Sequence, residues 1–455
     1  MSFSHEALLK AVRATGSLES VLKLSSGKTL KLYGRYLNFM SAHIMRFLGT
    51  NISFVRAAGN RLWDDQGNEY LDFFSGFGAL NLGHEPPEVL EALRLVENHP
   101  NLLQSAPNPC AAKLAELLAL ITPGALQRSF FCSSGAEAVE AALKLARIAT
   151  GRTVLLATEG AYHGKTFGAL SVSGRQKYKK HFLPLLPETE QIAYDDPGAL
   201  ESRLQKGDVA GFIVEPIQGE NGVILPHPGY LQKASALCRQ YGTLLLVDEI
   251  QTGFGRTGRL FACEHEGIEP DILILSKSLG GGVMPIGAIV TTDAIWKKAY
   301  GTMDTALLHS TTFGGNTRAC MAGLAAIHAL VEKDLIRNAE IQGHYLLEGL
   351  RRLQQKHAEL VREVRGRGLM LGMTFARVKG GSSLLEGALT LWISRRLLKK
   401  HRILVIFTLN NYDILRIAPP LTITRKEVDV FLEAFEDVLK SSRPLTLLPL
   451  TQRGS

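Results

Sequence analysis

The sequence predicts an α/β fold, in which a large domain with a mostly parallel central sheet flanked by helices is joined to a smaller α+β domain. Between about residues 60 and 337, short apolar runs alternate with helical patterns, as is typical of βαβ units. From residue 338 onward, long charged helices alternate with short strands. We therefore expect a large domain at 60–337, a C-terminal small domain at 338–455, and a helical arm with part of the small domain at 1–59.

The expected strands of the large domain are five apolar runs. They read TVLLAT (153–158), AGFIVEP (210–216), TLLLVDE (243–249), DILILSK (271–277) and IGAIVTT (286–292). Between the second and the third lies the segment 229–241, whose apolar residues fall on one helical face. Because the carboxyl ends of parallel strands meet at one edge of a sheet, we expect a ligand crevice at that edge.

Composition indicates a folded, globular protein. Of the 455 residues, 45% are hydrophobic and 21% are charged, which is near the average for such proteins. The formal net charge is +8, but seven basic and two acidic residues in the first 50 account for five of these charges. No apolar run approaches the roughly 18 residues of a membrane helix, and the N-terminus lacks an apolar signal region. We expect a cytoplasmic protein that does not span a membrane.

Two further features exclude common kinds of site. The five cysteines are far apart and form no C-x-x-C pair, and the thirteen histidines show no ligand spacing, so we expect reduced thiols and no metal. The basic N-terminal arm suggests nucleic-acid binding, but neither aromatic interleaving nor a known module accompanies it. The basic stretch 394–402 fits a solvated helix face, and we assign it no function.

A phosphate site is expected where a helix begins after Cys132. Ser134 and Glu137 have the spacing of a capping box, and apolar residues then repeat at helical spacing until Gly151. The backbone N–H groups at such a helix start, with the hydroxyls of Ser133 and Ser134, favour a phosphate. Most capping boxes only cap a helix, so this feature needs support from its neighbours.

Two charged residues stand at the ends of apolar strands, where burial is costly without a partner. Asp248 ends one strand, and Lys277 ends another, just before the glycines 280–282. An isolated lysine there usually extends to the surface, but a desolvated lysine amine can attack an aldehyde. Together with the phosphate site, these residues are the parts that hold pyridoxal phosphate, with Asp248 pairing with the pyridine nitrogen so that the ring can accept electrons.

Three neighbours complete this expected site. Gln251 is placed to hydrogen-bond the ring hydroxyl of the cofactor, and Tyr162 is placed to stack on the ring face. The alternative for Tyr162 is an ordinary aromatic contact in the core. His163, beside it, is expected in the cofactor environment with a structural rather than a catalytic role.

These segments, in this order, resemble the class III (fold type I) pyridoxal-phosphate-dependent aminotransferases. The resemblance covers about residues 60–423 and rests on CSSGAEAVEAALKLAR, GAYHGKTFGALS, VEPIQGENGVILPHPGYL, LLLVDEIQTGFGRTG, DILILSKSLGGGVMPIGA, HSTTFGGN and LRIAPPLTI. Within the family, GALNLGHEPPEV, FACEHEGIEPDIL and TLNN look most similar to the bacterial putrescine aminotransferases.

The resemblance implies a role for each site residue. Lys277 carries the cofactor as a Schiff base and then moves a proton between the substrate carbon and the cofactor. Ser134, Gly135 and Ala136 hold the phosphate, although many relatives have threonine where this chain has Ala136. Thr312 is expected to reach the same phosphate from the other subunit, so the active site implies a homodimer.

Substrate recognition is expected from a second group of residues. By resemblance, Arg416 grips the α-carboxylate of 2-oxoglutarate through a bidentate fork, and Glu220 pairs with it when an amine without a nearby carboxylate enters. On its residue context alone, Arg416 reads as a surface ion pair. Glu215 is expected to support the cofactor network. Shortly after Thr312, this chain has Thr317 where relatives usually have proline.

The sequence thus predicts a ping-pong transaminase that moves an amino group from a primary amine or a putrescine-like diamine to 2-oxoglutarate or pyruvate. The alternatives are an ornithine or acetylornithine type of donor, or an amine or aldehyde of a natural-product pathway. An aminomutase or a decarboxylase of the same fold is a further possibility.

Overall fold

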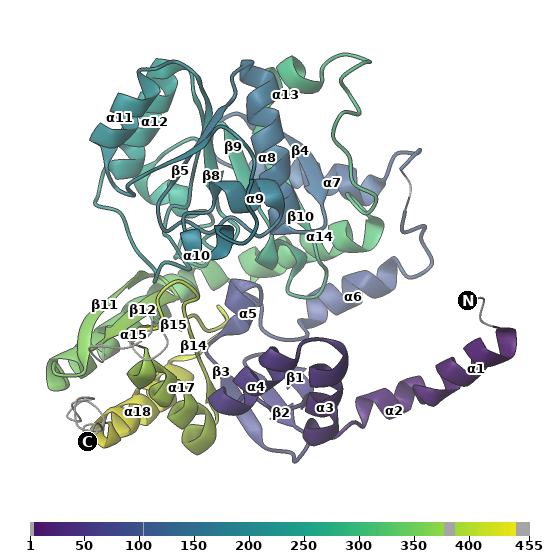
Figure 1. The fold of residues 1–455 in the computed structure, drawn as a ribbon, viewed down its shortest axis with the longest axis vertical. Helices are drawn as coiled ribbons and strands as arrows, with labels where there is room; N and C mark the ends of the chain where they lie inside the picture. The colour runs from purple at the N-terminus through teal and green to yellow at the C-terminus, as the bar shows by residue number, and fades with distance from the viewer. Residues whose placement is uncertain (1–3, 103, 377–386, 443–455) are drawn as a thin grey trace.

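The structure is a computed structural model that describes residues 4–102, 104–376 and 387–442. Figure 1 shows a large sheet with its helices in the upper part of the molecule and two smaller sheets with their helices below it. None of the helices in the described ranges combines the length and the apolar character that a membrane crossing requires.

The central sheet has seven strands. Their order is β4 (Leu126–Cys132), β10 (Gly287–Thr292), β9 (Ile272–Leu275), β8 (Leu244–Asp248), β7 (Val209–Val214), β5 (Val154–Thr158) and β6 (Thr189–Ile192). The strands from β9 to β6 run parallel, and β10 is antiparallel to both of its neighbours. All five expected runs form strands of this sheet, and the prediction of a mostly parallel central sheet is confirmed.

Helices bury both faces of this sheet, which explains why its strands are apolar throughout. Successive residues of β7 alternate between two cores: Phe212 and Val214 pack in one, and Ile213 packs in the other. One face is covered by α8 (Gly135–Thr150), α9 (Phe167–Val172) and α13 (Asp293–Tyr300), and the other by α7 (Pro109–Ile121), α12 (Tyr230–Tyr241) and α14 (Thr317–Glu332). The carboxyl ends of β7, β8 and β9 are therefore fixed side by side.

Two four-stranded sheets form the smaller parts. One is antiparallel, in the order β11 (Val361–Arg367), β12 (Met370–Phe375), β15 (Ile414–Ile417) and β14 (Ile406–Phe407), and it lies beside α15 (Leu335–Lys356), α17 (Ala388–His401) and α18 (Arg425–Ser441). The other has the order β1 (Phe54–Ala58), β2 (Arg61–Asp64), β3 (Glu69–Asp72) and β13 (Ile403–Leu404). This second sheet crosses residue 60, where the large domain was expected to begin, and joins the start of the chain to its C-terminal part.

Residues 4–50 are largely helical. The helices of this segment are α1 (His5–Ala14), α2 (Leu18–Leu22), α3 (Ser26–Tyr36) and α4 (Phe39–Leu48). Figure 1 shows α1 and α2 extending away from the rest of the molecule, and neither helix contains a buried residue. The remaining short elements are α5 (Ser75–Gly78), α6 (Pro87–Leu95), α10 (Gln176–Lys179), α11 (Pro197–Leu204) and the 3₁₀ turns Ala262–Glu266 and Lys277–Gly280.

Candidate active site

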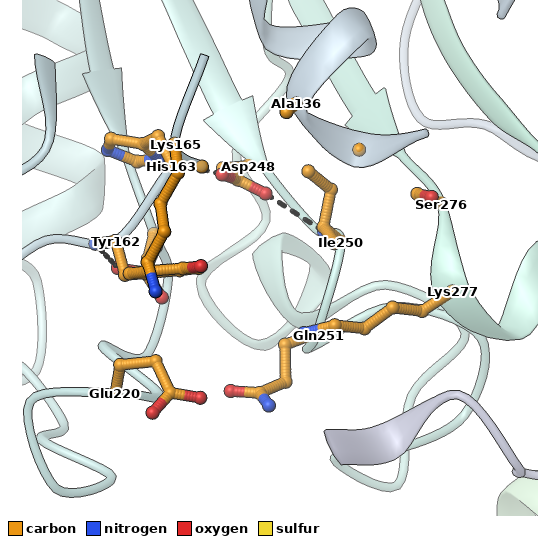
Figure 2. Close-up of a pocket in the computed structure, with 13 residues that line it drawn as sticks. Ala136, Tyr162, His163, Lys165, Glu220, Asp248, Ile250, Gln251, Ser276 and Lys277 are labelled. Atoms are coloured by element: carbon orange, nitrogen blue, oxygen red, sulfur yellow. Dashed lines mark hydrogen bonds and ion pairs between the residues drawn. The ribbon is translucent and has the colours of Figure 1, made fainter. Parts of the chain in front are cut away.

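A cavity of about 240 Å³ opens at the carboxyl ends of the central strands. Strands β7, β8 and β9 deliver Glu215, Asp248 and Lys277 to it, each at or just after the end of its strand. The cavity is lined by Gly135, Ala136, Tyr162, His163, Gly164, Lys165, Glu215, Glu220, Asp248, Ile250, Gln251, Ser276 and Lys277, most of which Figure 2 labels. The crevice expected from the sheet topology therefore contains most of the residues that the sequence singled out.

Lys277 lies two residues after the end of β9, and its side chain lies in the cavity (Figure 2). Its backbone has φ of 49°, in the left-handed region. Burial lowers the pKa of its amine to about 8; the charge of Glu220 opposes this shift, and the charge of Arg416 adds to it. A lysine with such a pKa has a substantial unprotonated fraction near neutral pH, as a nucleophilic amine requires.

Asp248 is the last residue of β8 and is buried, with 4% of its surface exposed. Its Oδ2 lies 2.7 Å from Nδ1 of His163, and its Oδ1 accepts a hydrogen bond from the backbone N–H of Ile250 at 3.0 Å. The next carboxylate, Glu249, belongs to another environment, where it accepts from the N–H of Cys263 at 2.7 Å. The carboxylate of Asp248, which ends this apolar strand, is thus stabilised by the imidazole of His163 and by a backbone N–H.

His163 is fully buried behind Asp248, and no described residue forms a hydrogen bond with its Nε2. Glu215 lies in the same network: its two oxygens accept from the backbone N–H groups of Tyr162, at 2.8 Å, and Gly219, at 3.1 Å. Burial raises the pKa of Glu215 to about 7, although His163 acts in the opposite direction. Glu215 thus holds the backbone at Tyr162 and at Gly219.

The start of α8 forms one wall of the cavity, through Gly135 and Ala136. Ser134 caps the helix, since its Oγ accepts from the N–H of Glu137 at 3.2 Å. The predicted reciprocal bond is displaced by one residue: Glu137 accepts from the N–H of Ser133, at 2.6 Å, rather than from that of Ser134. The expected capping box is therefore only half formed, because the Glu137 carboxylate reaches one residue further back.

This helix start is packed closely against the strand ends. A Cβ added to Gly135 would lie 2.9 Å from Cδ1 of Ile250, and one added to Gly164 would lie 2.8 Å from Cβ of Ala136. The glycines therefore allow the first turn of α8, whose N–H groups have no partners within the helix, to border the cavity. An anion such as a phosphate fits this position.

Gln251 and Thr312 occupy different positions relative to the cavity. Gln251 lines it, and its Nε2 donates to the backbone carbonyl of Phe77 at 2.9 Å. Thr312 is exposed and does not line the cavity of its own chain; its carbonyl accepts a hydrogen bond from Gln104. Of the expected cofactor residues, all except Ser134 and Thr312 line this cavity within a single chain.

Arg416 and Glu220 form a buried ion pair at the side of the cavity. Nη1 of Arg416 lies 2.6 Å from Oε1 of Glu220, and the Arg416 side chain is 1% exposed. Burial alone would raise the pKa of Glu220, but its bond to Arg416 holds that pKa below its usual value. The guanidinium lies 4.9 Å from the ring centroid of Phe77. Its Nε and Nη2 are buried and have no hydrogen-bond partner among the described residues.

Four residues of the cavity lining, Gly164, Lys165, Ile250 and Ser276, were missed by the sequence interpretation, and two of them are polar. Lys165 stands in the quoted segment GAYHGKTFGALS, and Figure 2 shows its side chain reaching past Tyr162 toward Glu220. Its Nζ lies 5.0 Å from the ring centroid of Tyr178. Ser276 precedes Lys277 and also lines the cavity. The only available signal for Lys165 was its place next to Tyr162 and His163.

Known proteins resemble this chain in sequence and in fold. The family model "Aminotransferase class-III" matches residues 46–439. "Aminotransferase PigE" from Serratia sp. (strain ATCC 39006) is 40% identical over 452 residues, which cover 90% of this chain and 53% of that protein. The chain therefore spans about half the length of this curated relative.

Solved structures give the same family. The ornithine aminotransferase from Toxoplasma gondii ME49 has a TM-score of 0.84 at 33% identity, covering 94% of this chain and 98% of that chain. A thermostable (S)-enantioselective omega-transaminase from Thermomicrobium roseum has a TM-score of 0.80 at 33% identity, covering 86% of this chain and 93% of that chain. With the family match over residues 46–439, these likenesses show that the chain belongs to the class-III aminotransferases, with the fold of the type I pyridoxal-phosphate enzymes.

Proposed function

We propose that this chain is a transaminase that takes the amino group of an ornithine-type donor and passes it to a 2-oxo acid, either 2-oxoglutarate or pyruvate, in a ping-pong cycle. The observation that carries this proposal is the buried Arg416–Glu220 pair: Glu220 lines the cavity of Lys277, whereas Arg416 does not line it and is reached only when Glu220 moves. The guanidinium fork of Arg416 fits the carboxylate of an oxo acid.

The cofactor is pyridoxal 5′-phosphate, as in the rest of the family, and the cavity fits it. Lys277 offers a buried amine, the first turn of α8 at Gly135 and Ala136 would hold the phosphate, and Asp248 would hold the ring nitrogen. Tyr162 and Gln251 would border the ring. When bound, this cofactor accepts the electrons released as the substrate Cα–H bond breaks.

The protein residues supply orientation and proton transfer. Asp248 is held by His163 and by a backbone N–H, so its carboxylate is oriented before any ligand arrives. Lys277, with its lowered pKa, would take the proton from the donor carbon and return it on the other side of the cycle. Glu215 holds the loop that carries Tyr162 in place.

Arg416 and Glu220 would allow one cavity to serve two unlike substrates. While the donor reacts, Glu220 neutralises Arg416, so that no unpaired charge faces the reacting amine. When the oxo acid enters, its carboxylate replaces that of Glu220 on the guanidinium. The net charge around Arg416 hardly changes in this exchange, because one carboxylate takes the place of another.

Lys165 favours a donor that carries a carboxylate away from its reacting amine. Its ammonium would attract such a group, whereas the free end of a diamine is a second ammonium and would be repelled. The ornithine aminotransferase similar to this chain also supports the ornithine-type alternative better than the putrescine-like diamine that the sequence analysis put first.

We also propose that the working enzyme is a homodimer in which Thr312 enters the cavity of the other subunit. Thr312 is exposed in the single chain, and near it the exposed apolar residues Met303, Leu307, Leu308 and Phe313 lie on the same segment. Exposed apolar side chains gathered in this way are typical of a surface that a partner covers. We expect the Thr312→Ala variant to sediment as a dimer, like the unaltered protein, but to bind pyridoxal phosphate with lower affinity.

A donor panel tests the proposal. The holoenzyme is mixed with ornithine, acetylornithine, putrescine or cadaverine, and the cofactor absorbance is followed until it reaches that of the amine form; 2-oxoglutarate or pyruvate is then added. We expect ornithine-type donors to convert the cofactor fastest and an oxo acid to be needed to restore it. Faster conversion by putrescine would overturn the donor assignment, and restoration without an oxo acid would indicate an aminomutase.

A further inference from the structure

The loop 408–413, between β14 and β15, contacts Glu220 at two points. The backbone N–H of Leu409 donates to Oε2 of Glu220 at 3.1 Å, which leaves Oε1 for Arg416. The backbone N–H of Asn410 donates to the carbonyl of Glu220 at 3.2 Å. Both carboxylate oxygens and the main chain of Glu220 are therefore held from the C-terminal small domain.

Two hydrogen bonds tie this loop to the large domain, one from a side chain of that domain and one from the loop's own Asn410. The hydroxyl of Tyr178 donates to the carbonyl of Leu409 at 3.0 Å, and Nδ2 of Asn410 donates to the carbonyl of Gly160 at 3.0 Å. Burial raises the pKa of Tyr178 to about 12, so its hydroxyl keeps the proton that it donates. Asn410 is 1% exposed, and a polar side chain this deeply buried is fixed by its hydrogen bonds.

We infer that the loop 408–413 sets how often the Glu220–Arg416 pair opens, with Tyr178 and Asn410 as positioning residues that act through Leu409. This inference rests on the proposed function, because opening matters only if an oxo acid must displace Glu220. The carboxylate cannot leave Arg416 without also releasing the Leu409 N–H. Whatever fixes Leu409 therefore favours the closed pair.

The consequence differs between the two halves of the cycle. An oxo acid binds only the open state, so its apparent affinity falls with the fraction of molecules that are open. The donor reacts in the closed state, in which Glu220 is paired with Arg416. This state predominates when the clamp, meaning the bonds of Tyr178 and Asn410 that fix the loop 408–413, is intact. Loosening the clamp thus strengthens oxo-acid binding and slightly weakens donor binding. General damage to the site would weaken both.

Tyr178→Phe is the variant that tests this inference. It removes the hydroxyl that holds Leu409 but keeps the ring beneath Lys165. We expect the half-saturating concentration of 2-oxoglutarate, in the half-reaction from the amine form, to fall about threefold to fivefold, the scale of one hydrogen bond. The limiting rate should not change. The half-saturating donor concentration should rise by less than about twofold, because the closed pair still predominates.

Tyr412→Phe is the matched control. It removes a hydroxyl from the same loop, but that hydroxyl accepts from Lys177 at 2.6 Å and does not touch Glu220 or Leu409. We expect both half-reactions of this variant to match those of the unaltered protein. Asn410→Ala removes the other anchor, the bond to Gly160, and should shift the oxo-acid half-reaction in the same direction as Tyr178→Phe, with thermal unfolding measured alongside.

The outcomes separate this inference from the proposed function. If the unaltered protein carries out both half-reactions but Tyr178→Phe leaves oxo-acid saturation unchanged or weakens it, the clamp is wrong and the transaminase assignment stands. If the unaltered protein transfers no amino group from any donor, the proposed function itself is wrong. A change of equal size in Tyr412→Phe would also reject the clamp.

Discussion

The cavity contains two groups of charges that are held in different ways. The strand-end group, Glu215, Asp248 and Lys277, follows buried strands, and its two carboxylates accept hydrogen bonds from backbone N–H groups. The ion pair of Glu220 and Arg416 is held by its own contact and by one loop. A group fixed by the sheet should serve every substrate alike, whereas a pair that can exchange partners should distinguish between substrates.

The largest effect is expected at Lys277. Lys277→Ala removes the amine that takes the proton, so both half-reactions should slow by roughly 10²- to 10⁴-fold, the contribution of a positioned acid or base. Stopped-flow absorbance with a donor alone and with an oxo acid alone measures this. Borohydride treatment followed by peptide mapping should label Lys277 in the unaltered protein. A label on Lys165, the other lysine of the cavity, would overturn the assignment.

Asp248→Asn should follow, with a loss of roughly 10²-fold in both half-reactions, since an oriented charge at the site of reaction contributes on that scale. The substitution keeps the size of the side chain. Asp271→Asn is a suitable control, because Asp271 is a half-buried aspartate just before β9 that accepts from the N–H of Leu245 at 2.8 Å, away from the cavity. If Asp248→Asn impairs only the oxo-acid half-reaction, the proposed difference between the strand-end group and the Glu220–Arg416 pair is wrong.

Arg416→Ala should impair one half-reaction selectively. It removes the fork for the oxo-acid carboxylate and leaves Glu220 buried without its partner, so kcat/KM for 2-oxoglutarate should fall roughly 10²-fold or more. The donor half-reaction should change much less. Arg416→Lys keeps the charge but not the fork and should lie between the two proteins. Equal losses in both half-reactions would place Arg416 with the strand-end group.

The smallest effect links the two groups through pH. Because only the unprotonated amine attacks an aldehyde, the rate at which the apoprotein binds pyridoxal phosphate should rise about tenfold per pH unit below the Lys277 pKa of about 8 and level off above it. The charge of Glu220 raises the pKa of Lys277, so Glu220→Gln should move this midpoint to lower pH. Glu348→Gln, which alters an exposed glutamate of α15, should leave the midpoint unchanged. A midpoint that moves upward in Glu220→Gln would contradict this electrostatic link.

The sequence was most informative where local chemistry is unusual. Asp248 and Lys277 could be predicted together because each ends an apolar run, and parallel strands place such ends at one edge of a sheet. The neighbours that hold the site could not be predicted in this way. His163 was expected near the cofactor, but its contact with Asp248, 85 positions along the chain, was not, and Leu409 lies 189 positions from Glu220. Both contacts depend on how distant loops meet, and the second joins the large domain to the C-terminal small domain. Likewise, the pairing of β3 with β13 is a contact between distant parts of the chain, with strands too short to leave a periodic pattern.

The backbone at residue 277 has a consequence for how such a protein can evolve. A φ of 49° suits glycine and costs other residues on the order of 1 kcal/mol or more. Selection for heat resistance alone would therefore favour glycine at this position. Such a substitution would relieve the backbone strain but would also remove the Lys277 amine. Only selection on chemistry keeps a lysine there, so durability and turnover are opposed at this single position.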